Sequence, residues 1–336
     1  MKNSMPLFKC PTKIALIDDD ELFLISMGEY LASKFEKINI KKYLSPNHII
    51  NDIKMNRKLE DCVSSKSQSY KDTEGQLILE YDLRNTFEAA QEKVKDNITV
   101  LVVDYSMPSM NGISFLEKVG DVQAYKILLT GIADERKAID AFNKGIIDCY
   151  LKKDEKNVFS MLYKKIIDGQ DLIFTKITDT LAYAISKTEK NTLLGNEGYN
   201  KIIKGLIEQY GIVYYYLIDE IGSCYMESED EEYVFYITED EKNKAFVEYL
   251  EDLILDSDEK NKEVKYLPKT IKENETLIFD KMVYEGRFVI DDLLKYKINT
   301  QVYTTTNKKY YYFFSKNNLD SINKKLYTKK IDPKFF

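Results

Sequence analysis

Short apolar runs alternate with amphipathic segments over the first half of the chain. Thr12–Ile17 and Ile98–Val103 are continuous apolar runs, as is typical of strands covered on both faces of a parallel sheet. Glu21–Phe35 instead places its apolar residues near one face of a helix. The same alternation predicts strands at Ile38–Leu44, Tyr125–Leu129 and Ile147–Leu151, and helices at Pro46–Leu59, Glu80–Val94, Ile113–Val119 and Asp134–Asn143. Residues 10–155 are therefore expected to form an α/β doubly wound parallel five-stranded sheet.

Two segments depart from this alternation. Glu60–Glu74 is polar and lacks an apolar period, so we expect an exposed loop within an insertion near residues 60–80. After Asp154, apolar residues at near-heptad spacing predict a helical linker over residues 156–190, interrupted at Gly169. Two interpretations of this linker stay open: two helices that pack on their own domain, or a dimerisation segment that pairs with its copy.

The second half of the chain has a different texture, with tyrosine-rich and β-branched strands separated by tight turns. The predicted strands are Ile212–Asp219, Ser223–Glu227, Tyr233–Thr238, Val302–Thr306 and Tyr310–Ser315, and the predicted helices are Ala245–Leu255 and Asn317–Tyr327. Strands joined by such short turns pair antiparallel. Residues 191–336 are therefore expected to form a separate α+β output domain.

Composition limits the classes of protein to consider. With 336 residues, 44% hydrophobic and 31% charged, the chain suits two soluble domains. It has no apolar stretch of membrane-spanning length, so we expect a cytoplasmic protein without membrane insertion. The net charge of −7 gives no general attraction to polyanions, and a single histidine excludes multi-histidine metal sites. The four cysteines are scattered singly and are expected to be reduced thiols.

Charged and hydroxyl side chains follow the predicted parallel strands at their carboxyl ends. Asp18 and Asp19 follow the first strand, Asp104 the third and Thr130 the fourth, and Lys153 lies just past the fifth. These ends share one rim of a doubly wound sheet, which is where such folds bind ligands. Three converging carboxylates require a hard cation such as Mg²⁺. Asp104 is then the expected nucleophile that forms an acyl phosphate, with Lys153 and Thr130 contacting the phosphoryl oxygens.

At these residues the chain resembles the CheY-like receiver domains of bacterial two-component response regulators, which have a flavodoxin-like fold. The matching segments are Lys13–Asp20, Leu101–Pro108, Asn111-Gly112, Leu129–Gly131 and Tyr150–Lys153. The resemblance covers about the first 155 residues. It implies that a sensor histidine kinase is the phosphoryl donor, and that the receiver only takes up and loses its own phosphate.

The resemblance also implies roles for individual side chains. Asp18, Asp19 and Asp104 are expected to hold Mg²⁺ together with the backbone carbonyl of Ser106. Tyr150 is expected to be the aromatic switch residue that moves with Thr130 on phosphorylation. The expected consequence is a phosphorylation-dependent homodimer.

Three features depart from the family pattern. Asp104 lies 86 positions after Asp18, roughly twice the usual spacing, which indicates the insertion. Asp154 replaces the proline that commonly follows the lysine, which puts in doubt the cis peptide often found there. Lys152 and Lys153 are both candidates for the conserved-type lysine, and the Tyr-Leu-x-Lys spacing favours Lys153.

The output half shows no helix-turn-helix pattern and no string typical of enzymes that make or degrade cyclic dinucleotides. Tyr216, Asp219, Gly222 and Ser223 match a Tyr-x-x-Asp-x-x-Gly-Ser pattern of atypical regulators, although an ordinary hairpin turn also explains it. Length and segment order are similar to the Lqs-type quorum-sensing response regulators. The favoured hypothesis is a non-enzymatic switch that acts on a downstream protein or nucleic-acid partner. The alternative is a nucleotide- or small-molecule-binding module, catalytic through carboxylates such as Asp219 and Glu227.

Overall fold

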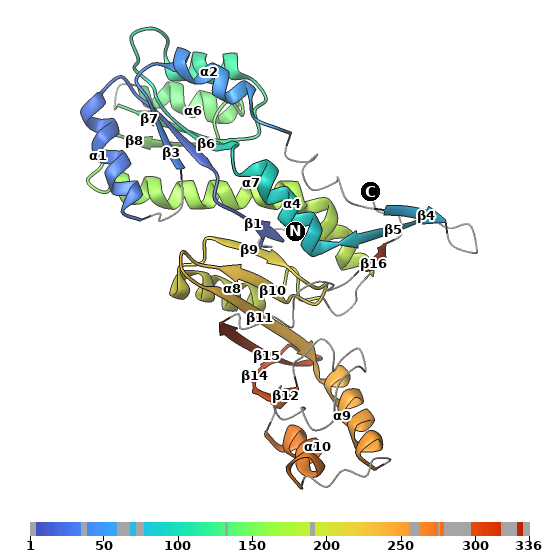
Figure 1. Cartoon of the computed structure of the whole chain (residues 1–336). Coiled ribbons are helices and arrows are strands. Elements are labelled where there is room, and N and C mark those ends of the chain that lie inside the picture. The colour runs from blue at the N-terminus through green and yellow to red at the C-terminus, as the bar shows by residue number, and fades with distance from the viewer. Residues whose placement is uncertain are drawn as a thin grey trace.

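The computed structural model contains two sheet-based units joined by a long helix (Figure 1). It describes residues 5–34, 39–58, 68–71, 77–131, 134–188, 192–255, 262–274, 276–278, 297–316 and 328–331. The predicted closing helix Asn317–Tyr327 and most of the predicted loop Glu60–Glu74 lie outside these residues. Among the described helices, none combines the length and the apolar character needed to cross a membrane.

The first unit contains a five-stranded parallel sheet in the order β3-β2-β6-β7-β8. Its strands are β2 (Lys13–Ile17), β3 (Asn39–Tyr43), β6 (Ile98–Asp104), β7 (Tyr125–Thr130) and β8 (Cys149–Lys152). Every residue of β6 is buried, as expected of a central strand that is covered on both faces. The predicted doubly wound fold class is confirmed.

Helices cover both faces of this parallel sheet. The helices are α1 (Glu21–Ala32), α2 (Pro46–Lys54), α5 (Gly112–Val119), α6 (Glu135–Asn143) and α7 (Val158–Thr188). Apolar residues of α2, α5 and α6 form one core cluster on the sheet, while α1 and the first half of α7 form another. Because helices cover both faces of the sheet, ligands reach it from solvent at the ends of the strands, where the site lies.

The second unit is built on a six-stranded antiparallel sheet in the order β1-β9-β10-β11-β15-β14. Its strands are β1 (Phe8–Lys9), β9 (Tyr214–Leu217), β10 (Cys224–Glu227), β11 (Glu232–Glu239), β15 (Lys309–Lys316) and β14 (Gln301–Thr304). The predicted antiparallel strands are therefore present. Strand β1 was not predicted; it comes from the amino-terminal segment and pairs with β9.

Helix α7 runs without a break from the parallel sheet into the second unit (Figure 1). The predicted interruption at Gly169 is wrong, because Gly169 lies inside the helix. A side chain there would collide with the ring of Tyr125, so glycine permits the helix to approach β7 closely.

The apolar stripe of α7 is covered by its own chain. Val158, Leu162 and Ile166 pack on the parallel sheet, whereas Ile173 and Ile177 are buried in the core of the second unit. This outcome matches the interpretation in which the linker packs within its own chain. A second copy cannot contact Ile173 and Ile177 in this arrangement, so the stripe gives no reason to expect a dimer.

The insertion forms part of a separate small sheet, and the helix that follows it packs into the core of the second unit. Strands β4 (Gln68–Lys71) and β5 (Leu77–Asp82) pair antiparallel, so the loop predicted at Glu60–Glu74 is wrong for residues 68–71. Helix α4 begins at Leu83, not at Glu80, and ends at Val94. On α4, the ring of Phe87 stacks on Phe8 of β1 with the ring centroids 5.4 Å apart. The helix that leads into the Asp104 strand is thus anchored in the core of the second unit.

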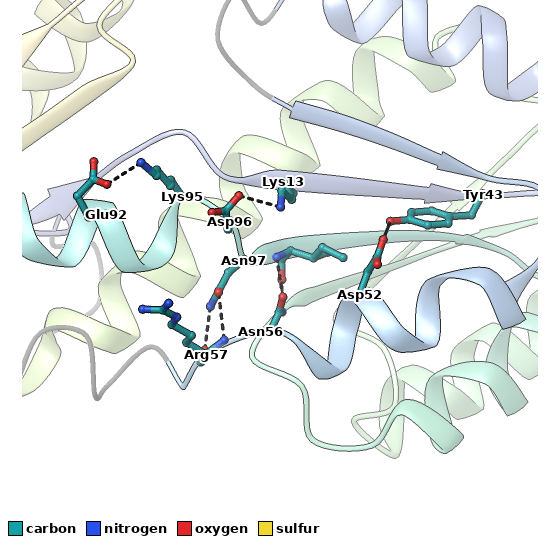
Figure 2. Close-up of polar contacts among 10 residues, drawn as sticks. Lys13, Tyr43, Asp52, Asn56, Arg57, Glu92, Lys95, Asp96 and Asn97 are labelled. Atoms are coloured by element: carbon teal, nitrogen blue, oxygen red, sulfur yellow. Dashed lines mark hydrogen bonds and ion pairs between the residues drawn. The ribbon is translucent and has the colours of Figure 1, made fainter.

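A hydrogen-bonded junction fastens the turn after α4 to the end of α2 (Figure 2). The side chain of Asn97 accepts from the backbone N–H of Arg57 at 3.1 Å and donates to the Arg57 carbonyl at 2.8 Å. Asn56 makes the same two bonds with the backbone of Ile98, both at 2.9 Å. Because each amide bonds both backbone groups of its partner, the junction fixes the start of β6 against α2.

Several elements carried no clear sequence signal, namely α8 (Glu197–Tyr210), α10 (Lys262–Asn274), β12 (Thr276–Ile278), β13 (Lys297–Asn299) and β16 (Thr328–Ile331). Helix α9 (Asp240–Leu255) was predicted only from Ala245 onward. Strand β16 pairs with β5 of the insertion. The domain boundaries expected at residues 155 and 190 stay predictions.

Candidate functional site

The parallel sheet brings the predicted acidic residues together at its carboxyl rim. Asp18 and Asp19 directly follow β2, and Asp104 is the last residue of β6. One oxygen atom from each of these three carboxylates lies within 4.8 Å of the others. The loop after β6 returns so close to Asp104 that a side chain at Gly112 would collide with the Asp104 backbone carbonyl. Asn111 caps helix α5 beyond this turn by accepting from Ser114 N–H at 2.9 Å.

Lys153 bridges the two buried carboxylates. Its ammonium nitrogen lies 2.7 Å from Oδ2 of Asp18 and 2.7 Å from Oδ1 of Asp104. The backbone N–H of Asp20 donates to Asp18 Oδ1 at 3.0 Å, and that of Ser106 donates to Asp104 Oδ2 at 2.8 Å. Each carboxylate is therefore held at both oxygens, and the Asp104 carboxylate stays at the strand end.

Burial and charge act in opposite directions at this site. Burial raises the pKa of Asp18 above its ordinary value, although Lys153 and the Asp20 amide favour the charged form. Burial alone would lower the pKa of Lys153, but its hydrogen bonds and ion pairs with Asp104 and Asp18 outweigh this effect and raise it. Lys153 is therefore the protonated partner of two crowded carboxylates over the physiological range.

The donor set suits a hard divalent cation. Three carboxylates supply oxygen ligands, and oxygen is the ligand type that Mg²⁺ prefers. Asp18 and Asp104 are buried, whereas Asp19 is exposed at the rim. In addition, Asp18 Oδ2 is buried and, apart from its ion pair with Lys153, accepts no well-aligned hydrogen bond from the described residues. The residues at this rim therefore fit a magnesium site.

The remaining predicted residues lie around this centre. Thr130 is buried at the end of β7, where its hydroxyl donates to the carbonyl of Gly131 at 3.1 Å. Tyr150 is half-buried and packs against the core on the α2, α5 and α6 face. Lys152 points elsewhere, forming an ion pair with Glu135 of α6 at 3.0 Å. Only Lys153 of the two lysines contacts the carboxylates.

Sequence reasoning missed two aromatic contacts near the site. The ring of Phe23, in the first turn of α1, lies under the Lys153 ammonium at 4.8 Å from its centroid. The hydroxyl of Tyr105 accepts a hydrogen bond from Lys137 of α6 at 2.8 Å. The signal for Phe23 was available, because a helix beginning at Glu21 places its first turn beside the Asp18-Asp19 pair. These contacts restrict how Lys153 and α6 lie beside the carboxylates.

The Tyr-x-x-Asp-x-x-Gly-Ser pattern of the output half forms a hairpin turn between β9 and β10. Oδ1 of Asp219 accepts from the backbone N–H groups of Ile221, Gly222 and Ser223 at 3.0, 2.9 and 3.0 Å. Gly222 has φ 142°, which favours glycine. The Ser223 hydroxyl accepts from Ile237 N–H at 3.0 Å in the neighbouring strand. The geometry thus gives these residues a structural role in the turn.

Replacing Asp219 with Ala is expected to lower the free energy of unfolding by about 2–4 kcal/mol, because three buried N–H groups would lose a charged acceptor. Asp219→Asn, which keeps an oxygen in place, should lose less. Urea unfolding followed by circular dichroism measures both values. Asp230→Ala, in the exposed turn between β10 and β11, is the matched control and should change stability by less than about 0.5 kcal/mol. Equal losses for Asp219→Ala and Asp230→Ala would contradict the structural role.

No protein-family model and no curated protein matches the chain, but solved structures do. The structure of the Legionella pneumophila response regulator LqsR superimposes with a TM-score of 0.65 at 24% sequence identity. The match covers 94% of this chain and 90% of that chain, so it includes both sheets. The chain has the LqsR fold. The shared fold thus extends over the parallel sheet and the antiparallel sheet.

Two further matches each cover about half of this chain. A receiver domain protein from Clostridium thermocellum matches at 20% identity and TM-score 0.32, covering 48% of this chain and 95% of that chain. A CheY-like receiver from Methanospirillum hungatei JF-1 matches at 18% identity and TM-score 0.32, covering 49% and 98%.

Proposed function

We propose that this protein is a response regulator that accepts a phosphoryl group on Asp104. The observation that carries the proposal is the contact of one lysine with two buried carboxylates, Asp18 and Asp104, at 2.7 Å each on the strand-end rim. Surface carboxylates that merely end strands would face solvent and would not share a partner. The LqsR-like order of a receiver fold and an output part supports the same function.

In the proposed reaction an oxygen of Asp104 attacks the phosphorus of a phosphohistidine or of a small acyl phosphate. The bond from phosphorus to the leaving group breaks as the bond to Asp104 forms, which gives an acyl phosphate. Asp18, Asp19, Asp104 and the Ser106 carbonyl would hold Mg²⁺, which neutralises charge on the transferred group. Lys153 moves its contact from the Asp104 carboxylate to the new phosphate, and Thr130 donates its hydroxyl to a phosphoryl oxygen.

The proposed donor is a sensor histidine kinase, and the proposed readout is a change of state in the receiver. Tyr150 lies on β8, the last strand of the parallel sheet before α7 begins at Val158, so movement beside the phosphate is passed to α7 through the short segment after Lys153. Because α7 is buried in both cores, its displacement would act on the second unit within one chain. A phosphorylation-dependent homodimer remains part of the proposal, with a surface other than the buried stripe of α7.

The direct test is phosphorylation by acetyl phosphate, measured by intact mass. With Mg²⁺ the wild-type protein should gain one phosphoryl group, and in EDTA the gain should be slowed severely, because the charge on the transferred group loses its counter-ion. Light scattering with and without beryllofluoride then reports the oligomeric state. Labelling at the same rate in EDTA would remove the metal from the mechanism, and identical molar masses would remove the dimer.

The alternative function, an output part that is catalytic through Asp219 and Glu227, has less support. The Asp219 carboxylate already accepts three backbone hydrogen bonds within the turn. Glu227 ends β10 and faces Glu232 across the hairpin. Regulation of a downstream protein or nucleic acid by the receiver therefore remains the favoured output.

A further inference from the structure

A cleft of about 460 Å³ lies between the two units, away from the phosphoryl site. Its walls come from α7, from α8 of the second unit and from the amino-terminal segment around Cys10. A volume of this size lies within the range of small-molecule sites in proteins, roughly 300–1,000 Å³. The rim residues Asp18, Asp104 and Lys153 do not line it.

Half-buried aliphatic side chains from separate elements form the inner wall. They are Ile167 of α7, Ile207 of α8 and Val213 just before β9, and Tyr215 adds an aromatic surface. A well-packed interior would bury these side chains fully, as it does Ile166 next to Ile167. An apolar body placed here would therefore remove further hydrophobic surface from water, at about 25 cal/mol per Å².

The charges around the cleft are unevenly paired, although its lining contains three lysines and three carboxylates and is formally neutral. Lys9 pairs with Asp171 at 2.5 Å, and Asp168 lies 3.9 Å from Lys165, a lysine outside the lining. Apart from these two pairs, the lining has two lysines, Lys34 and Lys204, and one carboxylate, Glu208. Neither lysine forms an ion pair within 4 Å in the described part of the chain.

We propose that this cleft binds a small amphipathic molecule with an apolar body and one negative charge. The apolar body lies against Ile167, Ile207 and Val213, and the anionic group lies near Lys34 and Lys204. Because Lys34, just after α1 of the first unit, and residues of α8 in the second unit both line the cleft, binding depends on how the two units are placed. A ligand and phosphorylation would therefore bias the same arrangement. The binding itself does not rest on the phosphoryl function, since no residue of the rim is involved.

The full-length protein can be tested with 8-anilinonaphthalene-1-sulfonate, an aromatic monoanion that fluoresces in apolar surroundings. We expect one saturable site from which decanoate, an aliphatic monoanion, displaces the dye. Val213→Trp, which fills the cleft, should weaken binding about tenfold or more, a change worth about 1.4 kcal/mol. Leu172→Trp is the matched control, because Leu172 is exposed on α7 and does not line the cleft.

Charge reversal tests the anionic part without disturbing packing. Lys204→Glu should weaken dye and decanoate binding several-fold, whereas Lys201→Glu, exposed on the same helix outside the cleft, should leave it within about twofold. Equal affinities for Val213→Trp and Leu172→Trp, or no saturable binding to wild-type protein, would overturn the site. Equal affinities for Lys204→Glu and Lys201→Glu would overturn its charge preference. A far-ultraviolet circular dichroism spectrum and a urea unfolding midpoint like those of the wild type show that each variant is folded.

Discussion

Asp104→Asn protein is expected to gain no phosphoryl group from acetyl phosphate and Mg²⁺ under conditions in which the wild-type protein gains one. The amide of asparagine has the shape of the carboxylate but is not a nucleophile, so no acyl phosphate can form. Intact-mass spectrometry over a time course measures the difference.

The matched control for this substitution is Asp121→Asn, which changes an exposed aspartate in the loop after α5 and should be labelled like the wild type. Peptide mapping of the labelled wild-type protein should place the modification within the segment that contains Asp104. Equal mass gain in Asp104→Asn and wild-type protein would assign the phosphate to another residue and would remove the proposed site.

The receiver fold could be predicted because each of its elements carries a local signal. The run Ile98–Val103 is continuously apolar, as in a strand covered on both faces, and Asp104 follows it directly. Both the strand and its functional end can therefore be recognised in the sequence. The contact of Lys153 with Asp104 followed from the position of strand ends on one rim. Sequence spacing also favoured Lys153 over Lys152, whose ammonium pairs with Glu135 instead.

The connections between the two units could not be predicted, because they depend on contacts between residues far apart in the chain. Strand β1 has only two residues, Phe8 and Lys9, and an element that short has no period. The near-heptad stripe of α7 was visible, but a stripe of buried apolar residues looks the same whether a second copy or the same chain covers it. The tertiary structure decides this point, with Ile173 and Ile177 in the intramolecular core.

The insertion shows the same limit. Helix α4 was recognised from its apolar spacing, but β4 contains polar residues such as Gln68 and Ser69 and lacks strand periodicity, and β5 was partly assigned to the helix. These strands form because they pair with each other, and the sequence of each strand alone does not predict this pairing. Conversely, the Tyr-x-x-Asp-x-x-Gly-Ser pattern was visible, and the structure shows that backbone hydrogen bonds to Asp219 explain it.

Removing the charge of Lys153 is expected to destabilise the protein in the absence of Mg²⁺. In Lys153→Met protein, Asp18 and Asp104 would remain buried without their shared counter-ion, and such a loss costs about 3 kcal/mol. Lys152→Met is the matched control, because the Lys152–Glu135 pair is partly exposed to solvent and should contribute much less to stability. Urea unfolding in EDTA measures both variants. Adding Mg²⁺ should restore part of the stability of Lys153→Met, since a cation can replace the ammonium between the carboxylates.

The pH dependence of this effect has a defined sign. The pKa of Lys153 is raised in the folded protein, so its stabilising contribution is present below its ordinary value and is lost as the pH rises through the folded value. The pKa of Asp18 is also raised, so acidification neutralises Asp18 and reduces the repulsion in Lys153→Met. The stability difference between wild-type and Lys153→Met protein should therefore be widest near neutral pH and narrow towards both extremes. A difference that does not change between acid and neutral pH would mean that Lys153 acts through packing, for example on Phe23, and not through the charge of Asp18 and Asp104.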